Sequence, residues 1–202
     1  MPILAGTGNG RVMRGCFFRK WTRLASVLPI VGDLTSNDLG AMNALHTTQM
    51  IKPFEDRLRL MLWVSPSVND YEYAVAALKV ARSLFACVKV HPQTDAISLT
   101  DPRYLPYIEL CREFHLPFVS HTELDSFCSK EMLAELAEKN PDVDFVAVHM
   151  GLHSDHSLAM RLISDYSNLY GDTTLVSADI AAETVEICRA EKILFGTDAP
   201  VM

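Results

Sequence analysis

The sequence predicts an α/β fold of the (β/α)₈ TIM-barrel type, incomplete because a first strand and a last helix are missing. Strand-like apolar runs alternate with helix-like segments, and a new strand begins roughly every 25 to 30 residues. The later strands are expected to start near Leu60, Ala86, Pro117, Asp144, Asn168 and Ile193. Four of these strands end in ionisable side chains, which is typical of a closed barrel. An open sheet instead concentrates its site at one switch point. The 202 residues therefore suit one barrel domain, residues 1–202.

The first elements can be assigned in order. Residues 1–24 form an irregular segment, because GTGNG indicates a turn and is not a GxGxxG fingerprint. Residues 25–33, ASVLPIVGD, are expected to form a strand in spite of Pro29. Residues 37–54 are expected to form a helix, and residues 57–66 the next strand. The apolar positions of this helix include Ala41, Leu45 and Met50.

Five further segments keep the helical spacing of apolar residues. Their apolar positions are Ala74, Ala77, Leu78, Ala81 and Phe85; Ile108, Cys111 and Phe114; Met132, Leu133 and Leu136; Leu158, Leu162, Ile163 and Tyr166; and Ile180, Thr184 and Ile187. Asn69 or Asp70 is expected to cap the first of these helices, and Ser129 the third. Pro106 suits the first turn of the second. Residues 168–173 and the run ILFGTD complete the series of strands.

Composition and charge exclude several classes of protein. The net charge is -7, and the acidic bulk of the chain lacks the basic stripe of a nucleic-acid surface, although five basic residues stand among the first 25. No apolar run approaches the roughly 20 residues that span a bilayer. The five cysteines have no CxxC spacing and predict reduced thiols in a cytoplasmic protein. We therefore expect a small-molecule substrate and neither a nucleic-acid nor a membrane partner.

The ends of four strands carry the candidate site residues. Alternate residues of a strand share a face. The residues expected on the inner faces are Cys87, Lys89 and His91; Val119, His121 and Glu123; Phe145, Ala147 and His149; and Leu194, Gly196 and Asp198. Because the carboxyl ends of parallel strands meet at one edge, the ionisable members of these four sets are expected to lie together.

Imidazoles and carboxylates that converge in this way suit zinc or a similar divalent metal. His121 is the first candidate ligand, and Asp198 could bind the metal and also take a proton from an attacking water. His149 is a second ligand or a hydrogen-bond donor to the substrate. Lys89 is either carbamylated to bridge two metals or paired with a substrate carboxylate. One ion is expected, and a second stays open; His91 and Glu123 are further candidates for substrate binding.

Other reactive side chains have structural interpretations. A single histidine at a strand end is more often a satisfied structural residue. His153 and His156 are expected to be solvated or capping, and Cys128 lacks a base partner for nucleophilic chemistry. Trp63 is most simply a core residue. The interpretation as a metal site thus depends on all four strand ends together, in register with the repeat of strands and helices. No single strand end would support it.

Five motifs in this order carry a resemblance. The motifs are VKVHPQ, LPFVSHTE, NPDVDFVAVHMG, NLYGDTT and ILFGTDAP. Together they resemble the amidohydrolase-related family of metal-dependent TIM-barrel hydrolases and decarboxylases, over residues 57–200. The resemblance implies that His121 is the strand-five metal ligand, that His149 is the strand-six histidine, and that Asp198 is the strand-eight aspartate that binds metal and handles the proton. It also implies zinc or another divalent ion.

The sequence departs from that family at both ends. The family opens with a His-x-His pair on its first strand, and no such pair occurs here. Residues 25–33 fill the position of the second strand, so the pair is expected upstream of Met1. The chain ends four residues after Asp198. We therefore expect a shortened copy whose open strand edges favour association into a homo-oligomer.

Three functions are compatible with these residues. The first is a metal-dependent hydrolase in which metal-activated water attacks a C–N or C–O bond of a small, carboxylated compound. The second is a metal-dependent decarboxylase that uses the same site. The third is a catalytically impaired fragment or binding module that lacks the His-x-His pair.

Overall fold

Seven parallel strands form one sheet in the computed structural model, which describes residues 30–31, 39–124 and 127–198. They are β1 (Ile30–Val31), β2 (Arg59–Trp63), β3 (Phe85–Val90), β4 (Phe118–Glu123), β5 (Phe145–Leu152), β6 (Leu169–Asp172) and β7 (Ile193–Leu194). Each strand pairs in parallel with the next one along the chain, so the spatial order equals the sequence order. This order is that of a TIM barrel, and the described sheet is an incomplete one.

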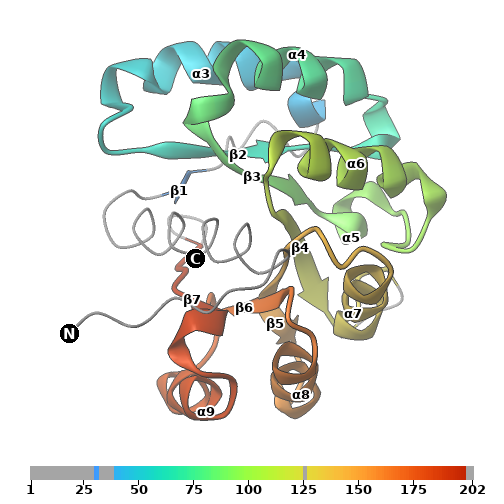
Figure 1. Ribbon diagram of the computed structural model, residues 1–202, viewed down its shortest axis with the longest axis vertical. Coiled ribbons are helices and arrows are strands. Elements are labelled where there is room, and N and C mark those ends of the chain that lie inside the picture. The colour runs from blue at the N-terminus through green and yellow to red at the C-terminus, as the bar shows by residue number, and fades with distance from the viewer. Residues whose placement is uncertain (1–29, 32–38, 125–126, 199–202) are drawn as a thin grey trace, which may run out of the picture.

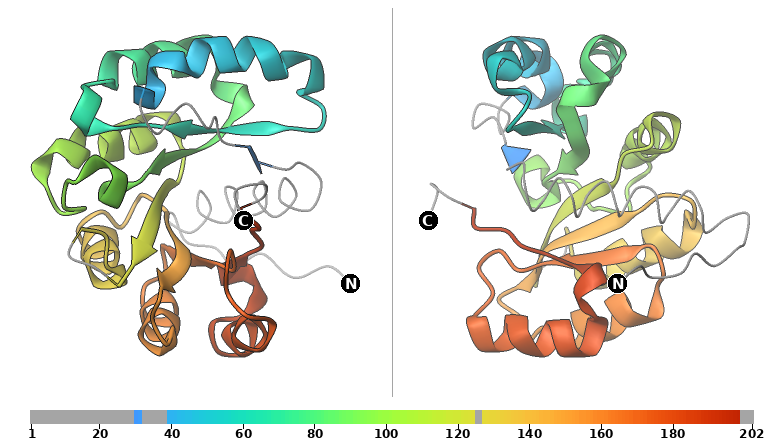
Figure 2. Two further views of the ribbon diagram at one scale, coloured as in Figure 1. Left: turned by 180° about the vertical axis from the view of Figure 1, so that it is seen from behind. Right: turned by 60° about the vertical axis from the view of Figure 1, so that its left-hand side comes forward.

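Helices connect the strands and lie around the outside of the curled sheet (Figures 1 and 2). The α-helices are α3 (Ala44–Ile51), α4 (Tyr71–Ala81), α5 (Pro92–Asp95), α6 (Leu105–Phe114), α7 (Lys130–Lys139), α8 (Ser157–Asp165) and α9 (Ala178–Cys188). Short 3₁₀ helices are η1 (Gly40–Asn43), η2 (Lys52–Phe54), η3 (Pro66–Val68), η4 (Arg82–Leu84), η5 (Pro102–Tyr104) and η6 (Ala190–Lys192). The predicted fold class is thus confirmed, whereas the irregular segment 1–24 and most of the predicted strand 25–33 lie outside the described residues.

Two separate apolar cores lie on the two faces of the sheet. The larger one fills the space between strands and helices and contains Val88 and Val90 of β3. The smaller one lies on the inner face and consists of Cys87, Val119, Val146, Tyr170 and Leu194, with Met61 and Val148 packed against it. Cys87 and Val88 are neighbours in sequence but belong to different cores, which is the alternation expected of a strand. Lys89 follows Cys87 on the inner face, as predicted.

Local predictions were confirmed for two helices and wrong for Phe85 and Asp70. The helices marked by Leu45, Met50 and Ile187 are present, although these side chains are 37%, 62% and 50% exposed. Phe85 begins β3 and does not belong to the preceding helix. Asp70 stands at the N-cap of α4 without capping it, because its carboxylate accepts hydrogen bonds from the backbone N–H groups of Ala41 and Ser65 and from the Tyr107 hydroxyl.

The ends of α6 and α7 follow the prediction. Ser129 caps α7, because its Oγ accepts a hydrogen bond from the Met132 N–H at 3.3 Å. Pro106 lies in the first turn of α6. Among the described residues, no helix is long and apolar enough to span a membrane. The four described cysteines are buried and form no disulfide with one another.

We predict that Asn168→Ala lowers the free energy of unfolding by about 2 kcal/mol. The buried Asn168 Nδ2 lies 2.9, 3.1 and 2.8 Å from the carbonyl oxygens of Ala137, Asn140 and Val143, and it thereby ties the α7–β5 connection to β6. Alanine removes this donor from all three carbonyl groups, of which the Asn140 carbonyl keeps the Val143 N–H at 3.1 Å. Urea unfolding of the variant and of the exposed-site control Gln49→Ala measures the difference, and equal midpoints would show that the tie contributes nothing.

Candidate functional site

Four predicted site residues come together at the carboxyl ends of three neighbouring strands. Lys89 lies near the end of β3 and His91 directly after it, His121 lies in β4, and His149 lies in β5. Lys89, His121 and His149 are at most 7% exposed. The parallel pairing of β3 with β4 and of β4 with β5 brings the three strand ends to the same edge. The convergence expected from the strand ends is therefore present for these four side chains.

Four aromatic rings form a continuous row across this edge. The ring centroids of Trp63 and His91 are 5.9 Å apart, and those of His91 and His121 are 4.0 Å apart; both pairs are stacked within 13° of parallel. The His149 ring meets His121 edge to face, with centroids 4.9 Å apart. The sequence analysis assigned Trp63 to the core. Its membership in this row depends on the register of β2 against β3, which places Trp63 opposite Lys89.

Lys89 is a buried ammonium group among neutral rings. Its side chain is 6% exposed, and its Nζ lies 5.9 Å from the centroid of the Trp63 ring. In the described part of the chain, no carboxylate lies within 4.0 Å of it. Burial lowers the pKa of Lys89 to about 8, although Asp172, Cys87 and Asp198 raise it. Among the described residues, this cation thus has no close anionic partner.

His91 and His149 are neutral at pH 7. Burial is the main cause that lowers the pKa of His91 to about 3, with further contributions from His121 and Lys89. Its Nδ1 accepts a hydrogen bond from the Thr94 N–H at 3.4 Å, so Nε2 carries the proton and can donate. Burial also lowers the pKa of His149.

The tautomer of His149 follows from one hydrogen bond. Its Nδ1 lies 3.1 Å from the Thr174 carbonyl oxygen, and a carbonyl can only accept, so Nδ1 carries the proton. Since the ring is neutral, Nε2 keeps its lone pair. This is the pattern of histidines that bind a metal or take a proton, in which the second ring nitrogen is held by an acceptor.

Glu123 joins two histidines. His121 Nε2 lies 3.2 Å from Glu123 Oε2, and His153 Nδ1 lies 3.0 Å from Glu123 Oε1. A register shift between His121 and Glu123 breaks the regular pairing of β4 with β5 there, which is a bulge of the kind that re-aims side chains near functional sites. His153, expected to be solvated or capping, is exposed but contacts Glu123. Both Glu123 oxygens therefore have histidine partners.

Asp198 does not join the row of rings. It is exposed and has a positive φ of 57°, yet its charge acts on both Lys89 and His149. The sequence analysis missed Asp172, the last residue of β6, which raises the pKa of Lys89 more than Asp198 does. The signal for Asp172 was its position at the end of the motif NLYGD, equivalent to that of the other strand-end residues.

The described residues fit a divalent metal only in part. His149 Nε2 is available as a neutral donor, but His121 Nε2 is engaged with Glu123, and His91 presents a proton instead of a lone pair. In the described ranges, no three His, Cys, Asp or Glu side chains form a group that could hold a metal ion. These residues therefore do not make a complete metal site, which usually has three protein ligands.

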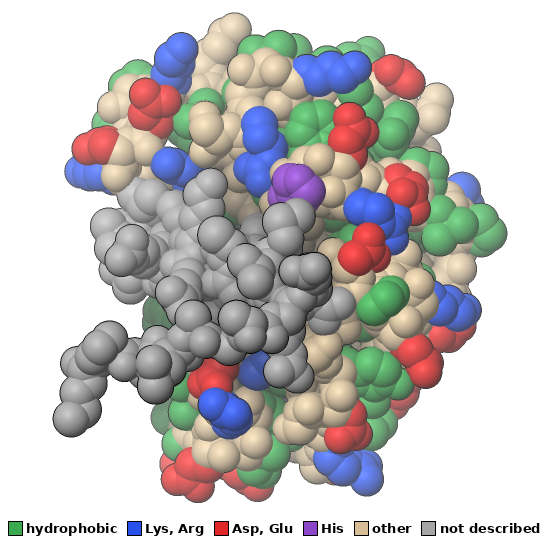
Figure 3. All heavy atoms as spheres, in the orientation of Figure 1, with side chains coloured by type: hydrophobic (Ala, Val, Ile, Leu, Met, Phe, Trp, Pro, Cys, Tyr) green, Lys and Arg blue, Asp and Glu red, His purple; other side chains and the backbone are tan. Residues whose placement is uncertain are grey.

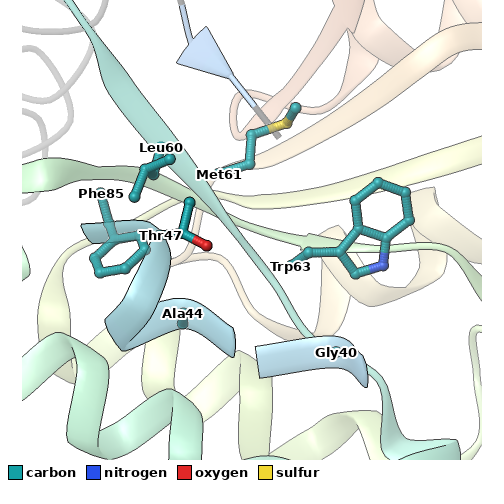
Figure 4. Close-up of a pocket in the computed structure, with 7 residues that line it drawn as sticks. All are labelled: Gly40, Ala44, Thr47, Leu60, Met61, Trp63 and Phe85. Atoms are coloured by element: carbon teal, nitrogen blue, oxygen red, sulfur yellow. The ribbon is translucent and has the colours of Figure 1, made fainter. Parts of the chain in front are cut away.

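A small pocket shares only Trp63 with this row of rings. It has a volume of about 10 Å³, room for no more than one water molecule, and is lined by Gly40, Ala44, Thr47, Leu60, Met61, Trp63 and Phe85. Figure 4 shows Leu60 on one side of β2 and Met61 and Trp63 on the other. On the face seen in Figure 3, the described acidic and basic side chains are interspersed and form no continuous basic stripe.

Comparisons with known proteins connect this arrangement to one family. The family model described as Amidohydrolase matches residues 31–202. An uncharacterized TIM-barrel protein from Bordetella bronchiseptica has a TM-score of 0.67 at 17% identity, over 95% of this chain and 79% of its own. No curated protein matches the chain.

Two other similar structures have named activities. A 5-carboxyvanillate decarboxylase from Novosphingobium aromaticivorans, complexed with manganese and 4-hydroxy-3-methoxy-5-nitrobenzoic acid, has a TM-score of 0.62 at 13% identity, over 90% of this chain and 70% of its own. A 4-oxalomesaconate hydratase from Rhodopseudomonas palustris has a TM-score of 0.61 at 16% identity, over 99% of this chain and 72% of its own. At these identities the likeness shows the fold.

We predict that Lys89→Met stabilises the protein at pH 7 by about 1 to 3 kcal/mol, because it removes a buried ammonium that has no close carboxylate among the described residues. The folded pKa, about 8, lies below the ordinary 10.5, so the unfolded chain binds more protons between these values. The free energy of unfolding of the wild type therefore rises with pH from about 8 to about 10.5. Thermal unfolding across this range should show the slope in wild type and in the exposed control Lys79→Met. A slope that persists in Lys89→Met would exclude Lys89 as its source.

Proposed function

Because the chain belongs to the amidohydrolase family, we propose that it is an enzyme that removes carbon dioxide from a small carboxylic acid bound at the edge where β3, β4 and β5 end. One observation supports this proposal most. Lys89 is buried, charged at neutral pH and without a close carboxylate among the described residues, so a substrate carboxylate is the partner that it lacks.

The neighbouring rings complete a binding site for such a group. His91 Nε2 carries a proton and can donate to a carboxylate oxygen. The half-buried Trp63 presents an apolar ring beside Lys89 and His91. Because both oxygens of Glu123 already contact histidines, we propose that Glu123 positions His121 and does not bind the substrate.

Decarboxylation needs one proton in each turnover. The bond between the carboxylate carbon and the rest of the substrate breaks, its electron pair stays on the substrate, and a proton replaces carbon dioxide. Lys89 holds a dissociable proton with a pKa of about 8, so it can supply this proton near neutral pH. The similar structure of a decarboxylase that acts on an aromatic carboxylate supports this choice of reaction.

Hydrolysis of a C–N or C–O bond is the second candidate. It is favoured by His149, whose Nε2 lone pair can take a proton from an attacking water. Asp198 is the other candidate for that proton, and its charge already acts on His149. Both reactions need the same carboxylate-binding side chains, so the products, and not substrate binding, distinguish them.

A divalent metal is part of the proposal, and His121, His149 and Asp198 are its candidate ligands, which the structure does not gather into one group. When bound, such an ion would polarise the substrate or a water molecule. Zinc is one candidate, and the manganese in one similar structure makes that ion another. Because the described residues do not assemble a three-ligand set, we expect one weakly bound ion. The buried cysteines, which form no disulfide with one another, favour a reducing compartment, which we infer to be the cytoplasm.

We predict that the purified protein releases carbon dioxide from at least one member of a panel of small carboxylic acids that includes 5-carboxyvanillate. Lys89→Met should lower kcat/KM at least 100-fold, because it removes both the carboxylate partner and the proton source. Mass spectrometry of the products gives the reaction class. Products of water addition without loss of carbon dioxide would replace the decarboxylase with the hydrolase, and equal activity of Lys89→Met would refute the role of Lys89.

We predict weak binding of Zn²⁺ or Mn²⁺, with a dissociation constant in the micromolar range or above, because a complete set of three ligands is absent from the described residues. His149→Ala should weaken binding at least tenfold, whereas His46→Ala on the exposed face of α3 should not change it. Equilibrium dialysis with metal analysis measures both. Tight binding that survives His149→Ala would place the metal elsewhere.

A further inference from the structure

A second buried lysine lies outside the group already described. Lys130 is the first residue of α7 and is only 6% exposed. Within the described ranges its ammonium has no ion pair and no side-chain hydrogen bond. Burying most of a lysine side chain without an ion pair is unfavourable for folding. No partner for this ammonium is thus present among residues 39–124 and 127–198, and a bound anion is the partner that we consider.

The position on the helix makes this cost larger. α7 has ten residues, and its N-terminus carries the positive end of the helix dipole, where an anionic side chain is favourable and a cation is not. The exposed Glu131 follows the usual rule, whereas Lys130 opposes it. Ser129 Oγ accepts from the Met132 N–H, which leaves the N–H groups of Lys130 and Glu131 without an intrahelical acceptor. The cation and the helix end together favour an anion.

Lys130 also lies next to the strand that carries His149. A Cβ atom added to Gly151 would be 3.1 Å from Lys130 Cδ, 3.3 Å from its Nζ and 3.0 Å from Ser154 Oγ. Gly151 is two residues beyond His149 and has a φ of +85°, so a larger residue would meet both strain and the lysine. The Lys130 ammonium thus lies close to Gly151, near the carboxyl end of β5.

The carboxylate of Asp155, on which the Lys130 charge acts, is occupied elsewhere. The Asp155 carboxylate accepts hydrogen bonds from the Ser157 N–H at 3.1 Å and from its Oγ at 3.0 Å. These bonds are the main cause that lowers the pKa of Asp155, and the charges of Lys130 and His156 add to them. Asp155 therefore feels the Lys130 charge but does not pair with it.

We propose that Lys130 and the N-terminus of α7 bind a compact oxyanion, and that this oxyanion is the second carboxylate of a doubly charged substrate whose first carboxylate binds Lys89. The inference deepens the proposed function and rests on it for the assignment to the substrate. The same chemistry would also accept a free anion such as inorganic phosphate, and the two sources differ in their dependence on Lys89.

Phosphate binding tests the anion site without turnover. In the Lys89→Met protein, which lacks the other cation, isothermal titration calorimetry should detect phosphate binding at constant ionic strength. Adding Lys130→Met should weaken it at least tenfold, whereas adding Lys139→Met, an exposed lysine on the same helix that pairs with Glu135, should leave it unchanged. Lys130→Arg keeps the charge and should retain binding. Phosphate affinity that is the same with and without Lys130→Met overturns the site.

Dicarboxylate binding tests the assignment to the substrate. In wild type, glutarate should bind at least tenfold more tightly than butyrate, and Lys130→Met should abolish this difference while butyrate affinity stays constant. If phosphate binding depends on Lys130 but glutarate has no advantage, the anion is a free one and the substrate assignment is overturned.

Two controls keep the outcomes separate. Lys130→Met should unfold at a higher temperature than wild type when no anion is present, because the buried charge is gone; a lower temperature would mean that Lys130 has a structural partner and would overturn the proposal. If the proposed reaction itself is wrong, the reaction products and the activity of Lys89→Met will show it. Neither measurement depends on Lys130.

Discussion

The alternation of side chains across parallel strands is the constraint on which this structure depends. Each strand must cover a helical core with one face and fill the inside of the curled sheet with the other. In β3, Val88 and Val90 pack outward, so Cys87 and Lys89 have to point inward. Because every strand runs in the same direction, the last inward residue of each strand lies at one edge. The burial of Lys89 and the contact between His121 and His149 follow from this geometry.

The parts of the fold that depend on periodicity could be predicted from the sequence, and those that depend on tertiary partners could not. The strand ends and the Ser129 cap are local patterns, and both occur as expected. Asp70 has the pattern of a cap. Its carboxylate instead accepts hydrogen bonds from donors in η1, just after β2 and in α6. Trp63 has the pattern of a core residue, and only the register of β2 against β3 shows that it stacks on His91.

The site residues also divide into those that strand periodicity predicts and those that depend on tertiary contacts. Lys89, His121 and His149 were predictable because strand alternation alone brings them together. Asp198 follows β7 in an irregular stretch, so the alternation rule does not fix its side chain, and it is exposed. Lys130 was not predictable, because a lysine at the start of KEMLAELAEK resembles any solvated helical residue. Its side chain lies close to Gly151, a contact between segments 21 residues apart in sequence that no local pattern indicates.

The two buried lysines link binding to stability. The net charge of the chain is -7, yet both ammonium groups lie where the described carboxylates do not pair with them. Each costs folding free energy while it is unpaired, and an anion that binds only the folded state returns part of that cost. Neutral histidines beside Lys89 avoid adding further positive charge to the site. Such a site is less stable than an apolar one but attracts an anion. Replacing either lysine by methionine should therefore lower the affinity for the anion and raise the free energy of unfolding.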